Sequence, residues 1–472
     1  MRRTKIVCTI GPATSSPEMI QQLFEAGMNV ARLNFSHGAR EDHAGVIASL
    51  RQVSGRKHAP VAILQDLQGP KIRLGCFGGG RASLAAGAEF VITTLPVEGT
   101  AARASTTYDH LPQDVRPGDR LLLADGLIEL TALEVVEDAV RCRVVVGGEV
   151  SDHKGINLPG VAISASSMTT KDRGDLRFGI EQGVDAIAVS FVRGPADVLE
   201  AKRLIAETGA DTPVIAKLEK PEAIQHLAEI LDVSDGVMVA RGDLGVELPL
   251  EDVPLIQKEI IRRARAHAIP VITATQMLES MIGNPRPTRA EASDVANAIL
   301  DGTDAVMLSA ETAVGKYPVE TVRVMSRIAV QAEAALPQLA AGAPFERASS
   351  FPDVISEAAC RAASEVRARA IVAFTQSGFT ARLLAKYRPD VPILAFSPSD
   401  AVRRRLCLYW GTVPKAIRPI QYTHEMVEEI EALLLAENAV QTGDALVIVA
   451  GAPLWVRGAT NLIKLHRVEE RT

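Results

Sequence analysis

The sequence predicts an α/β protein with a (β/α)8 TIM barrel, an all-β lid domain inserted after the third barrel strand, and a C-terminal open-sheet α/β domain. Three observations support this prediction. Strand and helix patterns alternate in two separate stretches, a region rich in turn signals lies between them, and polar residues follow one predicted strand after another. Polar side chains at the carboxyl ends of parallel barrel strands are typical of an enzyme active site.

The first part of the barrel is predicted within residues 1–69. Short β-branched runs alternate there with helical patterns, which favours parallel strands joined by helices. The elements are, in order, strand Lys5–Ile10, helix Pro17–Ala26, strand Asn29–Asn34, helix Asp42–Val53 and strand Val61–Asp66.

Residues 70–169 follow a different pattern. Turn signals such as Arg116-Pro-Gly-Asp119 and Asp125-Gly126 separate short apolar runs, among them Leu121–Leu123 and Val140–Val146. Turns at this spacing predict a small all-β domain. Because it follows the third barrel strand, this domain would lie over the active-site face and could act as a lid.

Strand–helix alternation resumes over residues 170–340 and completes the barrel. Eight units in roughly 240 residues match the size of this fold, which is typically about 250 residues. A helix over Val319–Ala335 leads to a predicted linker, Pro337–Pro344. The five further strands are Ala186–Phe191, Pro213–Leu218, Gly236–Ala240, Pro270–Ala274 and Ala305–Leu308.

Residues 341–472 predict a separate α/β domain of the open-sheet type, because helices and strands again alternate. Its helices are predicted at Val354–Arg369, Phe379–Tyr387 and Met426–Asn438, and its strands at Ile371–Phe374, Pro392–Phe396 and Leu446–Ala450.

The composition argues against two classes of protein. Of the 472 residues, 47% are hydrophobic and 4% aromatic, and the formal net charge is −6. This charge and the few aromatic residues do not suit a nucleic-acid binder, and no apolar run approaches the length of a membrane span. The five cysteines are scattered and the N-terminal apolar stretch is too short for a signal peptide, so we expect reduced thiols and a cytoplasmic protein.

Two carboxylates, Glu219 and Asp243, follow neighbouring predicted strands. Hard oxygen ligands without nearby His or Cys suit Mg²⁺ or Mn²⁺. Solvated carboxylates, or ion pairs to Lys217 and Arg241, are the alternative. Two carboxylates at matching strand ends favour the metal site.

Cationic and small polar residues follow other strands. Lys217 and Arg32 are expected to bind a phosphoryl group, with ion pairing inside the barrel as the alternative. Gly242 begins a turn whose backbone N–H groups can approach an anion. The Thr275 hydroxyl could hold a substrate or relay a proton, or it could cap a helix over Gln276–Met281.

With these residues in view, the sequence resembles the pyruvate kinase family over essentially its whole length. The matching segments are Lys5–Pro12, Ala31–Gly38, Lys154–Gly160, Ala240–Glu247, Ala274–Met281, Pro285–Glu291 and Met307–Thr312. The resemblance implies transfer of a phosphoryl group from phosphoenolpyruvate to ADP, giving pyruvate and ATP. It further implies a homotetramer that is allosterically regulated.

The resemblance also implies roles for individual residues. Arg32 would contact the substrate phosphate and Lys217 would stabilise the phosphoryl group in transfer. Glu219 and Asp243 would hold Mg²⁺ or Mn²⁺. The implied contacts to the substrate's carboxylate side are Gly242, Asp243 and Thr275. The implied contacts to the nucleotide are Arg73, Lys154, His37 and Asn34. The enolate would be protonated through water near Thr275 and Ser309.

One departure from the family concerns K⁺. Members that require K⁺ bind it through the positions of Asn34, Ser36 and Asp66 and the carbonyl of Leu67, beside a segment Asp-Thr-Lys-Gly-Pro-Glu. Here Lys71 replaces that glutamate, and its ammonium could supply the missing positive charge. We therefore expect activity without added K⁺.

The C-terminal domain resembles the family's regulatory domain. A strand–turn–helix segment there could bind the phosphate of an effector through hydroxyl and backbone N–H groups, although such connections are also common in open sheets. Fructose 1,6-bisphosphate, another sugar phosphate and AMP all remain candidate effectors. The residues concerned are Thr375, Ser377, Gly378, Thr380, Trp455, Arg457 and Gly458.

Two other functions compete with this interpretation. One is a different Mg²⁺-dependent barrel enzyme acting on phosphoenolpyruvate or pyruvate, such as an aldolase or a carboxylase, which would not explain the inserted domain. The other is a metabolite-sensing protein on a degenerate kinase scaffold, against which the intact Lys217, Glu219, Asp243 and Thr275 argue.

Overall fold

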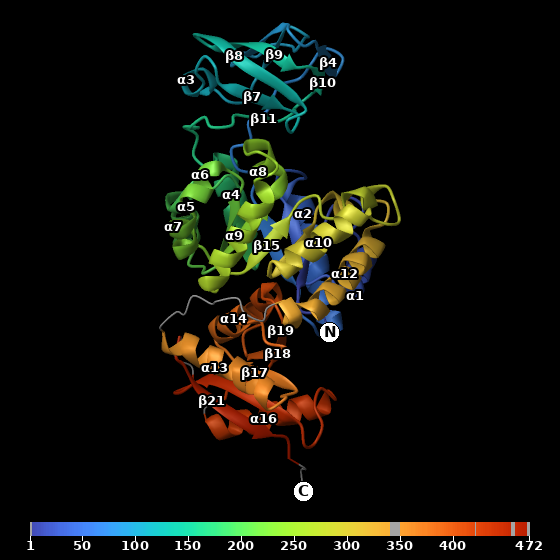
Figure 1. Ribbon diagram of the computed structural model, residues 1–472, viewed down its shortest axis with the longest axis vertical. Coiled ribbons are helices and arrows are strands. Elements are labelled where there is room, and N and C mark those ends of the chain that lie inside the picture. The colour runs from blue at the N-terminus through green and yellow to red at the C-terminus, as the bar shows by residue number, and fades with distance from the viewer. Residues whose placement is uncertain (1, 340–349, 421, 455–457, 470–472) are drawn as a thin grey trace.

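The computed structural model describes residues 2–339, 350–420, 422–454 and 458–469. Three parts follow one another along its long axis, with a β-rich domain at one end, the barrel in the middle and the C-terminal domain at the other end (Figure 1). Within these ranges, no helix combines the length and the hydropathy that crossing a bilayer requires.

Eight parallel strands form a closed barrel, as predicted, and β1 closes it by pairing with β16. Most strand residues are buried β-branched or small apolar residues, which suits a parallel sheet packed inside and covered by helices outside. The strands are β1 (Lys5–Thr9), β2 (Val30–Asn34), β3 (Ala62–Asp66), β12 (Ala186–Val189), β13 (Val214–Leu218), β14 (Gly236–Ala240), β15 (Val271–Ala274) and β16 (Ala305–Leu308).

Helices surround the barrel, and two of them begin with capping boxes. Thr169 caps α4 through the backbone N–H of Asp172, and Thr288 caps α10 through that of Glu291. The barrel helices are α1 (Pro17–Ala26), α2 (Arg40–Lys57), α4 (Thr170–Glu181), α5 (Pro195–Glu207), α6 (Pro221–Gln225), α7 (Leu227–Val233), α8 (Arg241–Glu247), α9 (Val253–Ala266), η1 (Glu279–Ile282), α10 (Arg289–Leu300), α11 (Ala310–Ala313) and α12 (Pro318–Leu339).

Two local predictions are wrong. The helix expected over Gln276–Met281 is a short 3₁₀ turn that begins only at Glu279, because Thr275 and Gln276 adopt positive φ angles that a helix cannot contain. The linker does not begin at Pro337, because α12 continues to Leu339, and its remaining positions, 340–344, lie outside the described residues. A proline in the last turn removes one hydrogen bond without ending the helix.

The inserted domain comprises a six-stranded sheet and a two-stranded sheet, β10–β4. Its core is separate from that of the barrel and includes Phe90, Leu130 and Val144. It approaches the carboxyl ends of the barrel strands, where Asn157 Nδ2 donates to Glu247 Oε1 at 3.1 Å. Its elements are β4 (Arg81–Leu84), β5 (Glu89–Thr93), β6 (Arg103–Ser105), α3 (Leu111–Asp114), β7 (Arg120–Leu123), β8 (Ile128–Val136), β9 (Ala139–Val146), β10 (Gly148–Ser151) and β11 (Ile156–Asn157).

The C-terminal domain is a five-stranded sheet of order β19-β18-β17-β20-β21, parallel except for β21. Its two edge strands escaped prediction, because edge strands carry more polar, exposed residues than central ones and so lack a continuous apolar run. Its elements are α13 (Phe351–Glu365), β17 (Ala370–Phe374), α14 (Phe379–Lys386), β18 (Ile393–Ser397), α15 (Asp400–Arg405), η2 (Leu406–Leu408), β19 (Thr412–Ala416), α16 (Thr423–Ala436), β20 (Ala445–Gly451) and β21 (Thr460–Arg467).

The C-terminal domain packs against the amino ends of the barrel strands. Cys407 and Leu408 of η2 join the apolar cluster at that end, together with Val30, Ala62 and Leu64. The barrel is therefore covered by one domain at each end, and the predicted catalytic face lies toward the inserted domain (Figure 1).

Within the C-terminal domain, an ion pair between Lys386 and Asp353 joins α14 to α13. The two side chains are 1% and 2% exposed, with Nζ 2.8 Å from Oδ2, and Tyr387 donates its hydroxyl to Asp353 Oδ1. Replacing Asp353 by Ala would leave a buried ammonium without its counter-charge. We expect chemical denaturation to show the C-terminal domain destabilised by about 3–5 kcal/mol.

The matched control is the double variant Asp353→Ala, Lys386→Met, which also removes the ammonium that has lost its counter-charge. Restoration of at least half of the lost stability is expected from the double variant. Equal destabilisation of the single and double variants would show that the charge is not the cause.

Candidate active site

Lys217 lies at the centre of a charged cluster near the carboxyl end of β13. Its Nζ atom is 2.8 Å from Glu219 Oε1 and 3.2 Å from Asp66 Oδ1, and it donates to Ser190 Oγ at 2.7 Å. Lys217 and Glu219 meet because alternate residues of an extended strand share a face. The cluster therefore joins the ends of three neighbouring strands, β3, β12 and β13.

Burial and charge act against each other at Lys217. Burial lowers the pKa of the ammonium, but the Asp66 and Glu219 carboxylates outweigh it, so that the pKa is raised. Burial likewise raises the pKa of Asp66, whereas Lys217 and Arg32 lower it, and the net shift is downward. The pair is therefore ionised at neutral pH.

Arg32, near the end of β2, is held by the same aspartate. Its Nε atom donates to Asp66 Oδ2 at 2.6 Å and its Nη1 atom donates to Thr9 Oγ1 at 3.0 Å. The Asp66 side chain is 1% exposed. One buried carboxylate thus positions both cations that the sequence analysis singled out as phosphoryl-binding residues.

Glu219 and Asp243 are the two candidate metal ligands. Glu219 Oε2 accepts a hydrogen bond from the Phe191 backbone N–H at 2.8 Å. Burial raises the pKa of Glu219, the Lys217 ammonium lowers it and the Asp243 carboxylate raises it, with a net upward shift. A divalent cation would relieve the repulsion between these carboxylates, so the residues fit such an ion.

The alternative, in which Glu219 and Asp243 form ion pairs with Lys217 and Arg241, is observed only in part. Lys217 does pair with Glu219, whereas Arg241 pairs with Asp294 Oδ1 at 2.7 Å. In the part of the chain that the structure describes, no group of three or more His, Cys, Asp or Glu residues could hold a metal ion. An ion at Glu219 and Asp243 would therefore take further oxygen ligands from water or substrate, as Mg²⁺ usually does.

These side chains line an open cavity of about 470 Å³ between the barrel and the inserted domain. The cavity brings together most of the barrel residues that the sequence analysis assigned to the active site. The cavity is lined by Arg32, Asn34, Ser36, His37, Gln68, Lys71, Arg73, Ser190, Phe191, Lys217, Glu219 and Asp243.

Thr275 and Gly242 contact each other directly. The Gly242 backbone N–H donates to Thr275 Oγ1 at 2.7 Å, and that hydroxyl donates to the Ala274 carbonyl, also at 2.7 Å. The hydroxyl therefore does not cap the predicted helix, and that alternative is wrong. Neither residue belongs to the set lining the cavity, although the next residue, Asp243, does.

The four residues assigned to the nucleotide by resemblance differ in position. Arg73 and His37 line the cavity together with Asn34, and Arg73 Nη1 donates to the His153 carbonyl at 3.0 Å. Burial lowers the pKa of His37, and Arg73, Lys71 and Arg32 lower it further. Lys154 is exposed and does not line the cavity.

The residues predicted to form a K⁺ pocket are close neighbours. Asn34 Oδ1 accepts from the Ser36 backbone N–H at 3.1 Å, and the Leu67 carbonyl accepts from Ser190 Oγ at 2.7 Å. Lys71 lines the same cavity as Asn34 and Ser36. Asp66, by contrast, is occupied by Arg32 and Lys217.

Ser309, the remaining candidate for the proton pathway, lies after β16. Its backbone N–H donates to the buried carboxylate of Glu311 at 2.6 Å, and burial raises the pKa of Glu311. Ser309 does not line the cavity.

The predicted effector loop joins β17 to α14 beside a pocket of about 350 Å³. Thr375, Ser377, Thr380 and Gly458 line this pocket. Gly378 has a φ of 89°, and its backbone N–H donates to Thr375 Oγ1 at 2.9 Å. Trp455 and Arg457 lie outside the described residues.

The sequence analysis missed Ser190 and Phe191, which follow β12. Ser190 accepts from Lys217, and the Phe191 backbone binds Glu219. Their position after β12 could have identified them, because each neighbouring strand carries a polar residue at its carboxyl end. The positive φ of Phe191, which directs its N–H toward Glu219, carries no signal in the sequence.

Comparison with known proteins agrees with this architecture. Residues 1–322 match the family described as pyruvate kinase, barrel domain, and residues 353–466 match pyruvate kinase, alpha/beta domain. The chain is 50% identical to a pyruvate kinase of Corynebacterium glutamicum over 473 residues, covering 100% of this chain and 98% of the relative.

Two further relatives extend the comparison. A pyruvate kinase of Mycobacterium tuberculosis is 51% identical over 472 residues, covering 99% of each chain. The crystal structure of a pyruvate kinase from Cryptosporidium parvum superposes with a TM-score of 0.92 at 38% identity, covering 99% of this chain and 96% of that one. The chain therefore belongs to the pyruvate kinase family of phosphotransferases.

Proposed function

We propose that the chain transfers the phosphoryl group of phosphoenolpyruvate to ADP, producing pyruvate and ATP with the help of a divalent metal ion. The observation that carries the proposal is the position of Lys217, held between Asp66 and Glu219 and beside Arg32 in one cavity. Phosphoryl transfer needs positioning and charge neutralisation more than covalent catalysis, and this cluster supplies both.

Arg32 and Lys217 would have different roles. Arg32 would bind the substrate's phosphate oxygens with the guanidinium N–H groups that do not hold Asp66. Lys217 would stabilise the negative charge on the phosphoryl group while it passes between the two oxygens. Its raised pKa supports this role, since the ammonium stays charged throughout.

Glu219 and Asp243 would hold Mg²⁺ or Mn²⁺. The ion, when bound, neutralises negative charge on substrate oxygens. Gly242 and Thr275 would bind the substrate's carboxylate side, and their mutual hydrogen bond keeps the turn before Asp243 in place. Water between Thr275 and Ser309 would deliver the proton to the enolate.

Arg73, Lys154, His37 and Asn34 would contact the nucleotide. Lys154 is the exposed member, and closure of the inserted domain would bring it toward the cavity. Closure would also exclude water, which otherwise hydrolyses the phosphoryl group. The lowered pKa of His37 keeps its imidazole neutral at pH 7, so that it can offer either a donor or an acceptor.

Three further properties belong to this proposal. The Thr375–Thr380 loop would bind a phosphorylated effector. A homotetramer is supported by exposed apolar side chains on two adjacent elements, with Phe351 85% and Val354 54% exposed on α13 and Leu465 57% exposed on β21. Five free thiols suit the reducing cytoplasm.

The aldolase or carboxylase and the metabolite-sensing protein are not supported by any particular observation. The pyruvate kinase matches include the inserted domain and the C-terminal domain, which an aldolase or carboxylase does not require. The intact cluster of Lys217, Asp66 and Glu219 argues against a degenerate scaffold.

Substitution of Lys217 by Met should abolish most of the activity. A coupled assay of ADP-dependent pyruvate release is expected to show kcat reduced by about 10²- to 10³-fold, because charge on the phosphoryl group is no longer neutralised. Lys57→Met removes an exposed lysine from α2 and should leave the rate unchanged. A Lys217→Met enzyme within a factor of about three of wild type would contradict the proposal.

The second prediction concerns K⁺. In tetramethylammonium buffer the wild-type enzyme should be active, and adding KCl should raise its initial rate by less than about tenfold, or 1.4 kcal/mol. Lys71→Glu removes the ammonium beside Asn34 and Ser36 and should make the rate depend on KCl. The control is Lys57→Glu, which makes the same charge change at a distance. A wild-type enzyme that needs KCl, or a Lys71→Glu enzyme that does not respond to it, would disprove this explanation.

A further inference from the structure

Two neighbouring turns of the candidate active site meet at Arg241, the first residue after β14. Arg241 begins α8, directly before Gly242 and Asp243, and its side chain is 12% exposed. The strand β14 pairs with β15, whose last residue, Ala274, is followed by Thr275. Arg241 therefore stands beside both the candidate metal ligand and the candidate substrate-binding hydroxyl.

The guanidinium group of Arg241 binds the backbone on both sides of the Thr275 Cα atom. Its Nη2 atom donates to the Thr275 carbonyl at 2.8 Å, and its Nε atom donates to the Ala274 carbonyl at 3.3 Å. The φ and ψ angles of a residue are set by the two peptide planes that flank it. One side chain thus holds both planes that define the conformation of Thr275.

That conformation is unfavourable without such contacts. Thr275 has a φ of 69° and Gln276 a φ of 55°, both in the left-handed region. Among the described residues other than glycine that have positive φ, Thr275 is the only β-branched one, and branching at Cβ makes this region especially unfavourable. Strained backbone of this kind persists only where the surrounding structure fixes it, and it is frequent at functional sites.

The left-handed turn places the Thr275 hydroxyl against the turn that leads to Asp243. The Gly242 backbone N–H donates to Thr275 Oγ1 at 2.7 Å, and a Cβ atom at Gly242 would lie only 3.3 Å from this oxygen. A change in the φ of Thr275 would therefore move the hydroxyl away from Gly242.

The guanidinium group is itself held from outside the site. Its Nη1 atom pairs with Asp294 of α10 at 2.7 Å and donates to Gln257 Oε1 of α9 at 3.4 Å, and its Nη2 atom also contacts the Met277 sulfur. Arg241 does not line the cavity. Because its N–H groups are directed at protein acceptors, any effect of Arg241 on a substrate must pass through Thr275 and the turn beside it.

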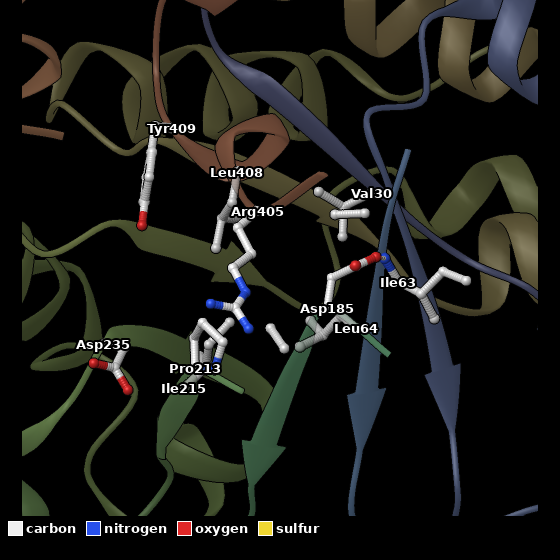
Figure 2. Close-up of a pocket in the computed structure, with 12 residues that line it drawn as sticks. Val30, Ile63, Leu64, Asp185, Pro213, Ile215, Asp235, Arg405, Leu408 and Tyr409 are labelled. Carbon is white, nitrogen blue, oxygen red and sulfur yellow. Dashed lines mark hydrogen bonds between the residues drawn. The ribbon is translucent and has the colours of Figure 1, made fainter. Parts of the chain in front are cut away.

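A second arginine makes a similar set of contacts at the opposite end of the barrel. Arg51 of α2 donates to the carbonyls of Val61 and Gly183 and pairs with Asp185 at 2.8 Å. Figure 2 shows Asp185 in the hollow between the barrel base and the C-terminal domain, with its carboxylate beside Ile63. Val61 has no positive φ, and a glycine adopts one without strain. Arg51 therefore holds unstrained backbone far from the cavity and provides a matched control.

We propose that Arg241 is a positioning residue, which holds Thr275 in the left-handed conformation that substrate binding requires. The inference rests on the proposed function, in which Thr275, Gly242 and Asp243 bind the carboxylate side of phosphoenolpyruvate. Arg241 touches neither substrate nor metal, and acts by keeping the Thr275 hydroxyl and the Gly242 N–H in register.

Steady-state kinetics of the full-length Arg241→Met enzyme test this role. The KM for phosphoenolpyruvate should rise by about tenfold or more and kcat/KM should fall by about 10²-fold, because Thr275 is displaced from the substrate's carboxylate side. The KM for ADP should stay within about threefold of wild type, since other residues would bind the nucleotide. A purely structural loss would lower the amount of active enzyme and leave both KM values unchanged.

A double-mutant cycle with Thr275→Ala shows whether Arg241 acts through Thr275. Independent losses of kcat/KM multiply, whereas losses through one shared group do not. The double variant Arg241→Met, Thr275→Ala should therefore be at most about threefold slower than Thr275→Ala alone.

Two further variants separate positioning from folding. Arg51→Met also removes an ion pair and two bonds to carbonyls, and should lower the thermal stability while the KM for phosphoenolpyruvate stays within about threefold of wild type. If Arg241→Met does not fold, Arg241→Lys serves in its place. One ammonium cannot span Asp294 and both carbonyls, so the same rise in KM is expected.

Amide hydrogen exchange tests the geometry without turnover. Mass spectrometry of a peptide that spans Gly242 should show faster exchange in Arg241→Met and in Thr275→Ala, because the acceptor of the Gly242 N–H is displaced or removed. Arg51→Met should exchange there as wild type does.

Three results would overturn the inference: an unchanged KM for phosphoenolpyruvate in the Arg241 variant, multiplying losses in the cycle, or unchanged exchange at Gly242. Failure of the proposed function would look different. In that case Lys217→Met would keep its rate, whereas Arg241→Met would still show faster exchange at Gly242.

Discussion

The buried carboxylate of Asp66 is the feature on which the rest of the active site depends. It holds Arg32 through one oxygen and Lys217 through the other, and so fixes two cations at the mouth of the barrel. Two like charges would otherwise repel each other in a poorly solvated cavity. Lys217 in turn pairs with one carboxylate oxygen of Glu219 and so orients this residue of the candidate metal site. In the proposed function, substrate charge, metal charge and protein charge would be arranged around one aspartate that need not contact the substrate itself.

The two ends of the barrel face different domains. The carboxyl ends of the strands face the inserted domain, whose Asn157 contacts Glu247 of α8. Glu247 also binds Lys220, the residue that follows Glu219. The amino ends face the C-terminal domain, with Cys407 and Leu408 packed into the barrel base. The strands that carry Arg32 and Asp66 begin at that base. A change in how the C-terminal domain packs would therefore act on the strands that carry Arg32 and its partner Asp66.

Much of this arrangement follows from local sequence patterns. The eight barrel strands are short buried runs, and Lys217, Glu219 and Asp243 stand where those runs end, so periodicity was sufficient to find them. Backbone conformations were not predictable, because the positive φ angles of Phe191 and Thr275 are imposed by tertiary contacts. The strand β21 was missed because only one side of it pairs with the sheet.

The central claim is that Glu219 and Asp243 together form a divalent metal site beside Lys217. The most direct measurement is Mn²⁺ binding by electron paramagnetic resonance, which detects the free ion and needs no turnover. Glu219→Gln and Asp243→Asn should each weaken binding by about tenfold or more, whereas Glu229→Gln, on the exposed surface of α7, should not. Lys217→Met should bind Mn²⁺ at least as tightly as wild type, because it removes a competing cation. Unchanged Mn²⁺ affinity in both carboxylate variants would contradict the account.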